Sequence, residues 1–408
     1  MSFPTRRQDL IHIVADAGLV LLFASAIAFA QPEEAIGSLQ SVFDGTLRPD
    51  VQVNTFRHID RLFPSRIVPH GASVYPLPPA QQRLTNVHFI SASRKFDLFD
   101  YLSLNRVSGL LVLKDGKIAY EDYELGNTER THWVSWSMVK SVSSTLVAAA
   151  IRDGYIASVD DPITKYLPQL SGSAYQGASI RNILQMASGV KWDETYTDPK
   201  SDRRHMLSLQ IEQKPGAILS FMASLPRAGA PGSIWNYSTG ETHIIGALIH
   251  AATKRPLAQY LSEKIWSTFG METDATWWLE SPDGLEVGGS GLSATLRDYG
   301  RFGLFVLGGG KAEDKAIVPE GWFHAAGSSK QVGNNPVDYG YMWWTYGPSA
   351  NPVHRDAFQA EGIFGQFIYI NPRERVVIVV WSSRPKPTGA NTIADSDFFG
   401  AVVSELHR

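Results

Sequence analysis

The stretch SMVKSVSSTLV at residues 137–147 predicts a helix that begins at its serine. Val142 and Leu146 are four residues apart, which is the spacing of one helix face. Serine is favoured at a helix start because its side chain accepts hydrogen bonds from free backbone N–H groups. On such a helix Ser137 and Lys140 lie on the same face, one turn apart. The sequence therefore predicts a buried helix with a hydroxyl and an amine side by side at its N-terminus.

Strands are predicted on both sides of this helix along the chain. Residues 107–113 and 117–123 are rich in β-forming side chains and flank Asp115-Gly116, a pair typical of a two-residue type I′ hairpin. Near the C-terminus, residues 367–371 and 375–382 form a second predicted hairpin, with the apolar run VVIVVW on its return strand. The order suggests one antiparallel sheet built from both ends of the chain.

Helices fill the chain between the two hairpins. The predicted helices cover residues 180–186, 241–253 and 257–269, and a closing helix covers residues 395–407. This order indicates an α+β fold, an antiparallel sheet covered by helices with an inserted helical lobe. The predicted parts are a signal peptide at 1–30, a mostly irregular wrapping segment at 31–95, a sheet domain at 96–150 and 286–408, and the helical lobe at 151–285. A ligand site is expected in a cleft between the two lobes.

The composition narrows the classes of function. The 408 residues carry 37 Lys and Arg against 40 Asp and Glu, so no basic excess points to a nucleic-acid partner. The chain has no cysteine, which excludes a disulfide and a thiolate nucleophile. It has no glycine pattern of a nucleotide-binding loop, no histidine pair with zinc spacing and no G-x-S-x-G turn. We therefore expect neither a cofactor nor a metal.

The first thirty residues differ from the rest of the chain. Arg6 and Arg7 precede the apolar run LVLLFASAIAFA at residues 19–30, which ends in Ala-Phe-Ala. The run is short for a membrane span, which needs about 20 residues. A cleaved signal peptide is therefore expected, with a periplasmic or secreted protein that keeps no stable membrane span. An uncleaved N-terminal anchor is the alternative.

Ser137 and Lys140 form an S-x-x-K motif, in which the amine could activate the hydroxyl. A serine hydroxyl is a poor nucleophile at neutral pH, and a lysine can act as its base only when a lowered pKa leaves the amine uncharged. Trp133 and Trp136 supply the apolar surroundings that disfavour the ammonium. By itself the motif is weak: residues 383–386 have the same spacing with an internal proline that breaks a helix. An ordinary N-cap serine is therefore the alternative for Ser137.

Two later motifs follow in the order that this chemistry needs. WNYSTG at residues 235–240 places Tyr237 in a turn directly before a helix, where a phenol could relay protons, with a core tyrosine as the alternative. EGIFGQ at residues 361–366 leads into a strand, and glycine there lets the backbone pass close to a ligand. An N–H on this strand edge could pair with the N–H of Ser137 to bind an oxyanion.

With these motifs, the chain resembles the class C β-lactamase-like serine hydrolases, and within them it is most similar to the 6-aminohexanoate-dimer (nylon-oligomer) hydrolases and related carboxylesterases. The resemblance spans about residues 95–385. Besides the three motifs, it rests on LLVLKDGKIAYEDY (110–123), DDPITKYL (160–167), ILQMASG (183–189) and GLSATLRDYGRFG (291–303). It implies a β-lactamase/transpeptidase-like fold.

The resemblance also implies roles for individual residues. Ser137 would be the acylated nucleophile, and Lys140 and Tyr237 the proton-transfer pair. The backbone N–H groups of Ser137 and Ile363 would form the oxyanion hole. Tyr196 falls where the nylon-oligomer hydrolases carry a substrate-covering loop, so it is a candidate for enclosing the acyl chain, with an ordinary loop aromatic as the alternative.

The chain departs from the family pattern at two places. Thr239 stands where β-lactamases carry the asparagine of Y-x-N, and residues 360–362 (AEG) stand in place of K-T-G. The lysine that would bind a β-lactam carboxylate is absent and an acidic side chain lies beside the predicted site, so an anionic substrate is disfavoured. The candidate substrate-binding residues are Tyr196, Glu361, Gly362 and Phe364.

We therefore expect an exported hydrolase of small-molecule amides or esters that works through an acyl-enzyme on Ser137. A β-lactamase or DD-peptidase acting on cell-wall peptides is one alternative, and a non-catalytic binding protein on the same scaffold is another. The sequence leaves open the natural substrate, the balance between amides and esters, and the oligomeric state.

Overall fold

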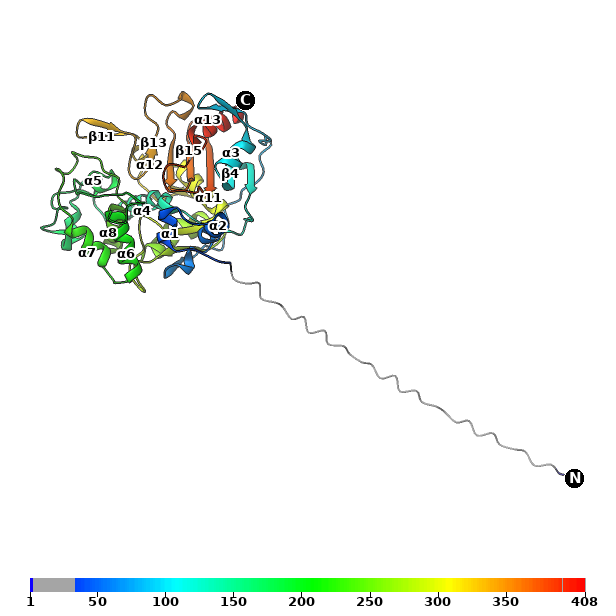
Figure 1. Cartoon of the computed structure of the whole chain (residues 1–408), viewed down its shortest axis with the longest axis horizontal. Coiled ribbons are helices and arrows are strands. Elements are labelled where there is room, and N and C mark those ends of the chain that lie inside the picture. The colour runs from blue at the N-terminus through cyan, green and yellow to red at the C-terminus, as the bar shows by residue number, and fades with distance from the viewer. Residues whose placement is uncertain (3–33, 391, 408) are drawn as a thin grey trace. The chain divides into compact units, whose positions relative to one another are not determined.

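The computed structural model describes residues 1–2, 34–390 and 392–407, so nearly all of the predicted signal peptide lies outside the described residues. Residues 35–408 form one compact unit, and some of its helices and strands are labelled in Figure 1. Among the described residues, no helix combines the length and the apolar character that crossing a bilayer requires.

A six-stranded antiparallel sheet forms the centre of this unit, in the order β13-β14-β15-β16-β4-β5. Its strands are β4 (Val107–Lys114), β5 (Lys117–Tyr123), β13 (Trp344–Thr345), β14 (Phe358–Gly362), β15 (Gln366–Asn371) and β16 (Val376–Ser382). β4 from the first predicted hairpin pairs with β16 from the second, which confirms a sheet built from both ends of the chain. Asp115 and Gly116 have φ angles of 51° and 77°, as a type I′ turn requires.

Different helices cover the two faces of this sheet, because side chains alternate along each strand. Leu111 and Val379 point to one face and join the apolar cluster of α4 (Val139–Arg152) and α11 (Leu296–Leu307). Leu110 and Val380 belong to a second cluster, with α3 (Leu98–Leu104) and α13 (Asp395–Leu406). The predicted α+β fold with a helix-covered antiparallel sheet is therefore confirmed.

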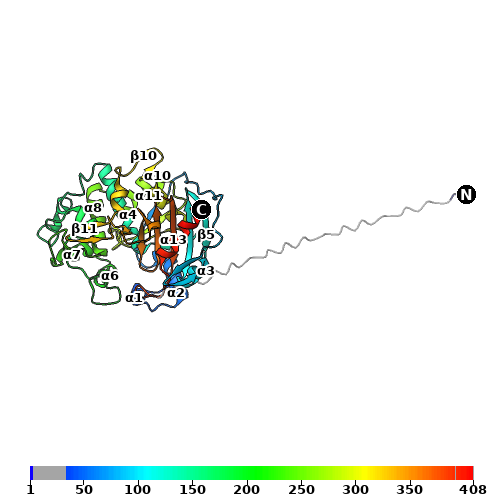
Figure 2. The same cartoon turned by 90° about the horizontal axis from the view of Figure 1, so that it is seen from above.

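Helices α5 to α8 lie together to one side of the sheet in both views (Figure 1, Figure 2). The helices of the middle of the chain are α5 (Ile180–Leu184), α6 (Asp202–Glu212), α7 (Ala217–Ser224), α8 (Thr239–Thr253), α9 (Leu257–Leu261) and α10 (Ser267–Phe269). A π-helical turn over Ser262–Trp266 joins α9 to α10, so the chain is helical throughout the predicted range 257–269. α8 packs against α4 and begins after Ser238, whose side chain accepts a hydrogen bond from the backbone N–H of Glu241.

A second antiparallel sheet, which the sequence did not predict, has the order β1-β7-β8-β6. Its strands are β1 (Ser65–Val68), β6 (His132–Val134), β7 (Ala275–Trp278) and β8 (Leu292–Thr295). Strands of three or four residues are too short to show an alternating pattern. β6 runs directly into the turn that carries Ser137, so this sheet positions the candidate nucleophile.

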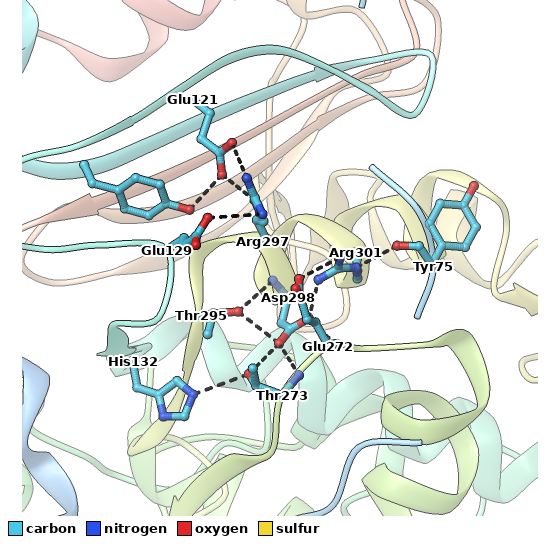
Figure 3. Close-up of polar contacts among 11 residues, drawn as sticks. Tyr75, Glu121, Glu129, His132, Glu272, Thr273, Thr295, Arg297, Asp298 and Arg301 are labelled. Atoms are coloured by element: carbon cyan, nitrogen blue, oxygen red, sulfur yellow. Dashed lines mark hydrogen bonds and ion pairs between the residues drawn. The ribbon is translucent and has the colours of Figure 1, made fainter. Parts of the chain in front are cut away.

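The buried carboxylate of Asp298 ties this second sheet to α11 (Figure 3). It accepts hydrogen bonds from the backbone N–H groups of Glu272 and Thr273, at 2.8 and 3.1 Å, and from the hydroxyls of Thr273 and Thr295. It also forms an ion pair with Arg301 at 2.8 Å. Thr295 is both the last residue of β8 and the N-cap of α11. The network therefore fixes β8, and β6 beside it, on a helix of the central sheet.

The N-terminal segment is more regular than the mostly irregular wrap that the sequence predicts. Besides β1 it contains α1 (Leu39–Asp44), α2 (Pro49–Arg57), β2 (Phe89–Ser91) and β3 (Arg94–Phe96). Pro49 opens α2 at a position where its missing N–H does not matter. α2 contacts β6, so this segment packs beside the strand that leads to Ser137. Short strands and one short α-helix complete these elements: β9 (Lys311–Ala312), β10 (Lys315–Ala316), α12 (Trp322–Ala326), β11 (Lys330–Val332) and β12 (Asn335–Val337), besides several 3-10 turns.

Candidate active site

Aromatic packing holds the Ser137 turn in an uncommon backbone conformation. Trp136 has a φ of 45°, a left-handed value that costs of order 1–3 kcal/mol for a bulky residue. Its ring packs against three buried phenylalanine rings, those of Phe43, Phe56 and Phe364, at centroid distances of 6.1, 5.1 and 5.3 Å. Ser137 lies in the short 3-10 helix Trp136–Met138. The α-helix therefore begins at Val139 and not at Ser137 as predicted.

Lys140 is only 1% exposed, and its amine makes three polar contacts. Nζ lies 2.8 Å from Ser137 Oγ, 3.0 Å from Thr239 Oγ1 and 2.9 Å from the carbonyl oxygen of Gly289. These partners come from the turn before α4, from the start of α8 and from the loop before β8. The tertiary fold therefore fixes the amine, and the two members of the S-x-x-K motif are in direct contact.

Burial lowers the pKa of Lys140 to about 7, because desolvation disfavours the ammonium. The charge of Glu194 acts in the opposite direction, and that of Arg203 lowers the pKa further. At neutral pH a substantial fraction of the amine is therefore uncharged. Its lone pair can then accept the proton of the Ser137 hydroxyl.

Tyr237 lies next to this amine. Lys140 Nζ is 5.2 Å from the centroid of the Tyr237 ring, and the ring stacks on Trp344 at 5.6 Å. Burial raises the pKa of the Tyr237 hydroxyl; the charge of Glu194 adds to the rise and hydrogen bonding to Ser137 opposes it. The phenol is therefore protonated at neutral pH and can donate to a leaving group. The structure thus brings Ser137, Lys140 and Tyr237 together.

β14 lies against the Ser137 turn and ends in the glycine-containing motif. A Cβ at Gly362 would lie 2.8 Å from the carbonyl oxygen of Ser135, so glycine is what permits this close approach. Ile363 follows directly and packs, partly buried, on the same apolar cluster. Phe364, expected to contact substrate, is fully buried and supports Trp136 instead.

Glu361 lies in β14, and its carboxyl oxygen accepts a hydrogen bond from the side-chain amide of Gln359 at 3.3 Å. Burial raises the pKa of Glu361 to about 7; the charge of Asp395 adds to the rise, and Gln359 and the charge of Arg384 oppose it. The charge of Glu361 also contributes to the raised pKa of Tyr237.

Tyr196 belongs to the loop between α5 and α6, which also carries Glu194. Its ring packs on that of Phe43 at 5.7 Å. Burial raises the pKa of its hydroxyl, and the charge of Glu194 adds to the rise. Its backbone carbonyl accepts a hydrogen bond from Arg204 at 3.0 Å. The ring contact with Phe43 and the hydrogen bond from Arg204 therefore hold this loop near the candidate site.

Comparison with known proteins gives the family. The family model described as Beta-lactamase matches residues 105–398. The chain belongs to the β-lactamase family. The matched region contains the S-x-x-K turn, Tyr237 and the β14 motif, so the family assignment and the geometry concern the same part of the molecule.

Hydrolases are among the relatives of this β-lactamase-family chain. It is 28% identical over 347 residues to the 6-aminohexanoate-dimer hydrolase of Paenarthrobacter ureafaciens, over 81% of this chain and 85% of that protein. It is 27% identical over 176 residues to Esterase EstB of Burkholderia gladioli, over 40% of this chain and 44% of that protein. A solved structure provisionally named 6-aminohexanoate-dimer hydrolase, from Bacillus anthracis, shares the fold with a TM-score of 0.77 at 23% identity, over 88% of this chain and 95% of that one. The predicted hydrolase class is thus confirmed.

The sequence motifs did not point to every residue of the site. Gly289, Arg203 and Glu194 belong to none of the motifs recognised in the sequence. Thr239 was noted as a departure from Y-x-N, and the structure shows that its hydroxyl contacts Lys140 directly. Among the described residues no group of three or more histidine and carboxylate side chains is arranged to hold a metal ion.

Proposed function

We propose that this β-lactamase-family enzyme hydrolyses amide or ester bonds of small molecules through an acyl-enzyme on Ser137. The observation that carries the proposal is the 2.8 Å contact between Ser137 Oγ and the amine of Lys140, whose pKa burial lowers to about 7. Such a contact lets the hydroxyl lose its proton as it attacks. Relatives named as a 6-aminohexanoate-dimer hydrolase and an esterase support the choice of amides and esters.

In the acylation step, Ser137 Oγ attacks the substrate carbonyl carbon and its proton passes to Lys140 Nζ. The carbonyl oxygen becomes an oxyanion, which the backbone N–H groups of Ser137 and Ile363 bind. The bond to the leaving amine or alkoxide breaks as Tyr237 protonates that group, and the Lys140 ammonium returns the proton to Tyr237. Water then attacks the acyl-enzyme by the same route and releases the acid and the free serine.

The carboxyl of Glu361 favours neutral or cationic substrates. An ionised carboxylate repels an anionic group and attracts an ammonium group in a poorly solvated site. Ala360, which stands where a K-T-G lysine would lie, is buried and supplies no compensating positive charge. The ammonium end of a 6-aminohexanoate oligomer fits this charge, provided that the oligomer's own carboxylate lies away from Glu361. Tyr196 and Gly362 would line the acyl chain.

The test compares the wild type with Ser137→Ala. A fluorophosphonate probe should label the wild type, and p-nitrophenyl esters and 6-aminohexanoate oligomers should be hydrolysed, whereas Ser137→Ala should do neither. Ser383→Ala is the matched control, because residues 383–386 repeat the S-x-x-K spacing while Lys386 Nζ contacts the carbonyl oxygen of Gly45. Equal labelling of wild type and Ser137→Ala would end the proposal, and strong labelling by fluorescent penicillin would redirect it to β-lactams or cell-wall peptides.

We also propose that the chain is exported and loses residues 1–30. The support is the basic start, the short apolar run and the Ala-Phe-Ala sequence before Gln31. N-terminal sequencing of the protein recovered outside the cytosol should begin at Gln31. Recovery of an intact N-terminus from a membrane fraction would favour the uncleaved anchor.

A further inference from the structure

Glu194 is a carboxylate that accepts hydrogen bonds from three groups beside the candidate site. Its Oε2 accepts from the Thr239 backbone N–H at 2.8 Å and from Trp192 Nε1 at 2.5 Å. Its Oε1 accepts from the Thr239 hydroxyl at 2.5 Å. The side chain is 15% exposed, and Arg203 Nε lies 4.0 Å from Oε1. The carboxylate is therefore fixed against both hydrogen-bond donors of Thr239, its backbone N–H and its hydroxyl.

This arrangement sets the direction of the hydrogen bonds at Lys140. A threonine hydroxyl has one hydrogen, and a carboxylate can only accept, so Thr239 donates to Glu194. Thr239 Oγ1 must then accept from Lys140 Nζ, 3.0 Å away. The carbonyl oxygen of Gly289, at 2.9 Å, must also accept. An uncharged amine has two hydrogens, and these two partners use both.

The lone pair of the uncharged Lys140 amine is thus left for Ser137 Oγ, at 2.8 Å. We propose that Glu194 is a positioning residue: by holding the Thr239 hydroxyl as an acceptor toward Lys140, it turns the lone pair of the general base onto the nucleophile. This inference rests on the proposed function of Ser137 and Lys140. Glu194 itself touches neither the nucleophile nor the substrate carbonyl in this scheme.

Charge provides a second, independent consequence. Glu194 raises the pKa of Lys140 while desolvation and Arg203 lower it, so the carboxylate limits how far the amine loses basicity. A variant without this charge should have a more weakly basic lysine. Orientation and basicity can therefore be separated by experiment, since the first changes the rate and the second changes its pH dependence.

The decisive variant is Glu194→Gln, which keeps shape and removes charge. The glutamine oxygen can retain the N–H donors of Thr239 and Trp192, and its NH₂ group then faces Thr239 Oγ1. The Thr239 hydroxyl would turn and donate to Lys140, taking up the lone pair. We expect the acylation rate with p-nitrophenyl acetate to fall by at least about tenfold with KM little changed. The acid limb of kcat/KM should move to lower pH, because the charge that raises the lysine pKa is gone.

Two substitutions at Thr239 check the same step. Thr239→Ser keeps the hydroxyl and should stay within about threefold of wild type. Thr239→Val removes the acceptor and should lose rate as Glu194→Gln does. Melting curves should show that Glu194→Gln and Thr239→Val are folded, and Glu212→Gln, an exposed glutamate of α6, is the matched control. A wild-type rate in Glu194→Gln, an acid limb that stays or moves to higher pH, or a wild-type rate in Thr239→Val would each overturn the inference.

Ser137→Ala separates this inference from the proposed function. If Ser137→Ala loses probe labelling and Glu194→Gln behaves as wild type, the nucleophile stands and only the role of Glu194 fails. If Ser137→Ala keeps labelling and turnover, the proposed function fails, and the inference fails with it.

Discussion

A lysine acts as a base only if its surroundings keep it uncharged and direct its lone pair. Lys140 is buried, and two of its three partners, Thr239 and Gly289, come from parts of the chain far from α4. Desolvation supplies the low pKa, and the two acceptors leave the lone pair facing Ser137. The same residue in an exposed helix would be an ammonium, whatever its spacing from a serine.

The pH dependence follows from this environment. For a neutral ester, kcat/KM should rise with pH through about 7, because only deprotonated Lys140 can accept the Ser137 proton. Lys140→Arg, which stays charged, should show no such limb and should lose at least about a hundredfold in rate. Initial rates from pH 5 to 9 provide the measurement. Rates that keep rising up to pH 9 without levelling off, as a lysine with the ordinary pKa of 10.5 would give, would contradict the assignment.

Selectivity for charge should depend on Glu361. Its pKa is raised to about 7, so the carboxyl is ionised above that pH and largely neutral below it. The ratio of kcat/KM for an ammonium-bearing ester over its neutral isostere should therefore rise with pH through 7. Glu361→Gln should lower this ratio by about three- to tenfold and flatten its pH dependence. Glu320→Gln, an exposed glutamate, is the control, and an unchanged ratio in Glu361→Gln would place the substrate charge elsewhere.

At the scale of residues, the sequence predicted only those contacts that follow from local spacing or from a turn motif. The contact of Ser137 with Lys140 follows from positions i and i+3 on one helical stretch. Glu194 and Thr239 are 45 positions apart, and their hydrogen bond depends on how the loop after α5 meets α8. No pattern in a single sequence encodes such a meeting of loops, so this part of the site came only from the structure.

At the scale of elements, α8 and the loop before β8 approach each other closely at Gly288. A Cβ at Gly288 would lie 2.4 Å from the backbone carbonyl of Thr242, so the loop can approach α8 only with glycine there. This approach brings the Gly289 carbonyl to Lys140 and keeps Thr239 within reach of the same amine.

Gly288→Ala should therefore impair both folding and chemistry. Separating the loop from α8 should destabilise the protein by about 1–3 kcal/mol and reduce kcat more than KM changes. Gly308→Ala, at the end of α11 with its nearest backbone neighbour at 3.2 Å, is the comparison and should have a small effect. Chemical denaturation and ester kinetics measure the two effects, and a wild-type kcat in Gly288→Ala would show that the Gly289 contact is dispensable.

At the scale of elements, the sequence predicted the longer strands and missed the shorter ones. The hairpins of β4–β5 and β15–β16 carried clear β-forming runs and were predicted. The four short strands of the second sheet were not, because pairing with distant partners and not local composition makes them strands. The helix expected from Ser137 begins at Val139 because tertiary packing of Trp136 imposes a 3-10 turn first.

At the scale of the whole molecule, the N-terminal segment supports the nucleophile from behind. Phe43 and Phe56 are fully buried and contact Trp136. The backbone carbonyl of Ile59 accepts a hydrogen bond from Trp278 Nε1 at 2.7 Å. The sequence predicted the arrangement of sheet and helical lobe from element order, but it gave no reason to place residues 39–57 against the site.

Two truncations test this support. A chain that starts at residue 35 should keep the melting temperature and the activity, because residues 35–408 form one unit. A chain that starts at residue 59 loses both phenylalanines, each worth about 3–5 kcal/mol in a core, and should be unstable and unlabelled by the fluorophosphonate probe. Thermal unfolding and probe labelling of the two chains make the comparison. Full labelling of the shorter chain would show that the active site forms without α1 and α2.

The pairing of β4 with β16 has a consequence for the order of assembly. The middle of the central sheet joins β4, from early in the chain, to β16, from near its end. The sheet therefore cannot form until the ribosome has synthesised almost the whole chain. A polypeptide threaded through a membrane amino end first would therefore remain open throughout the passage and could fold only once its last strand arrived. Because of this topology, such a chain would become an active hydrolase only after its translocation is complete.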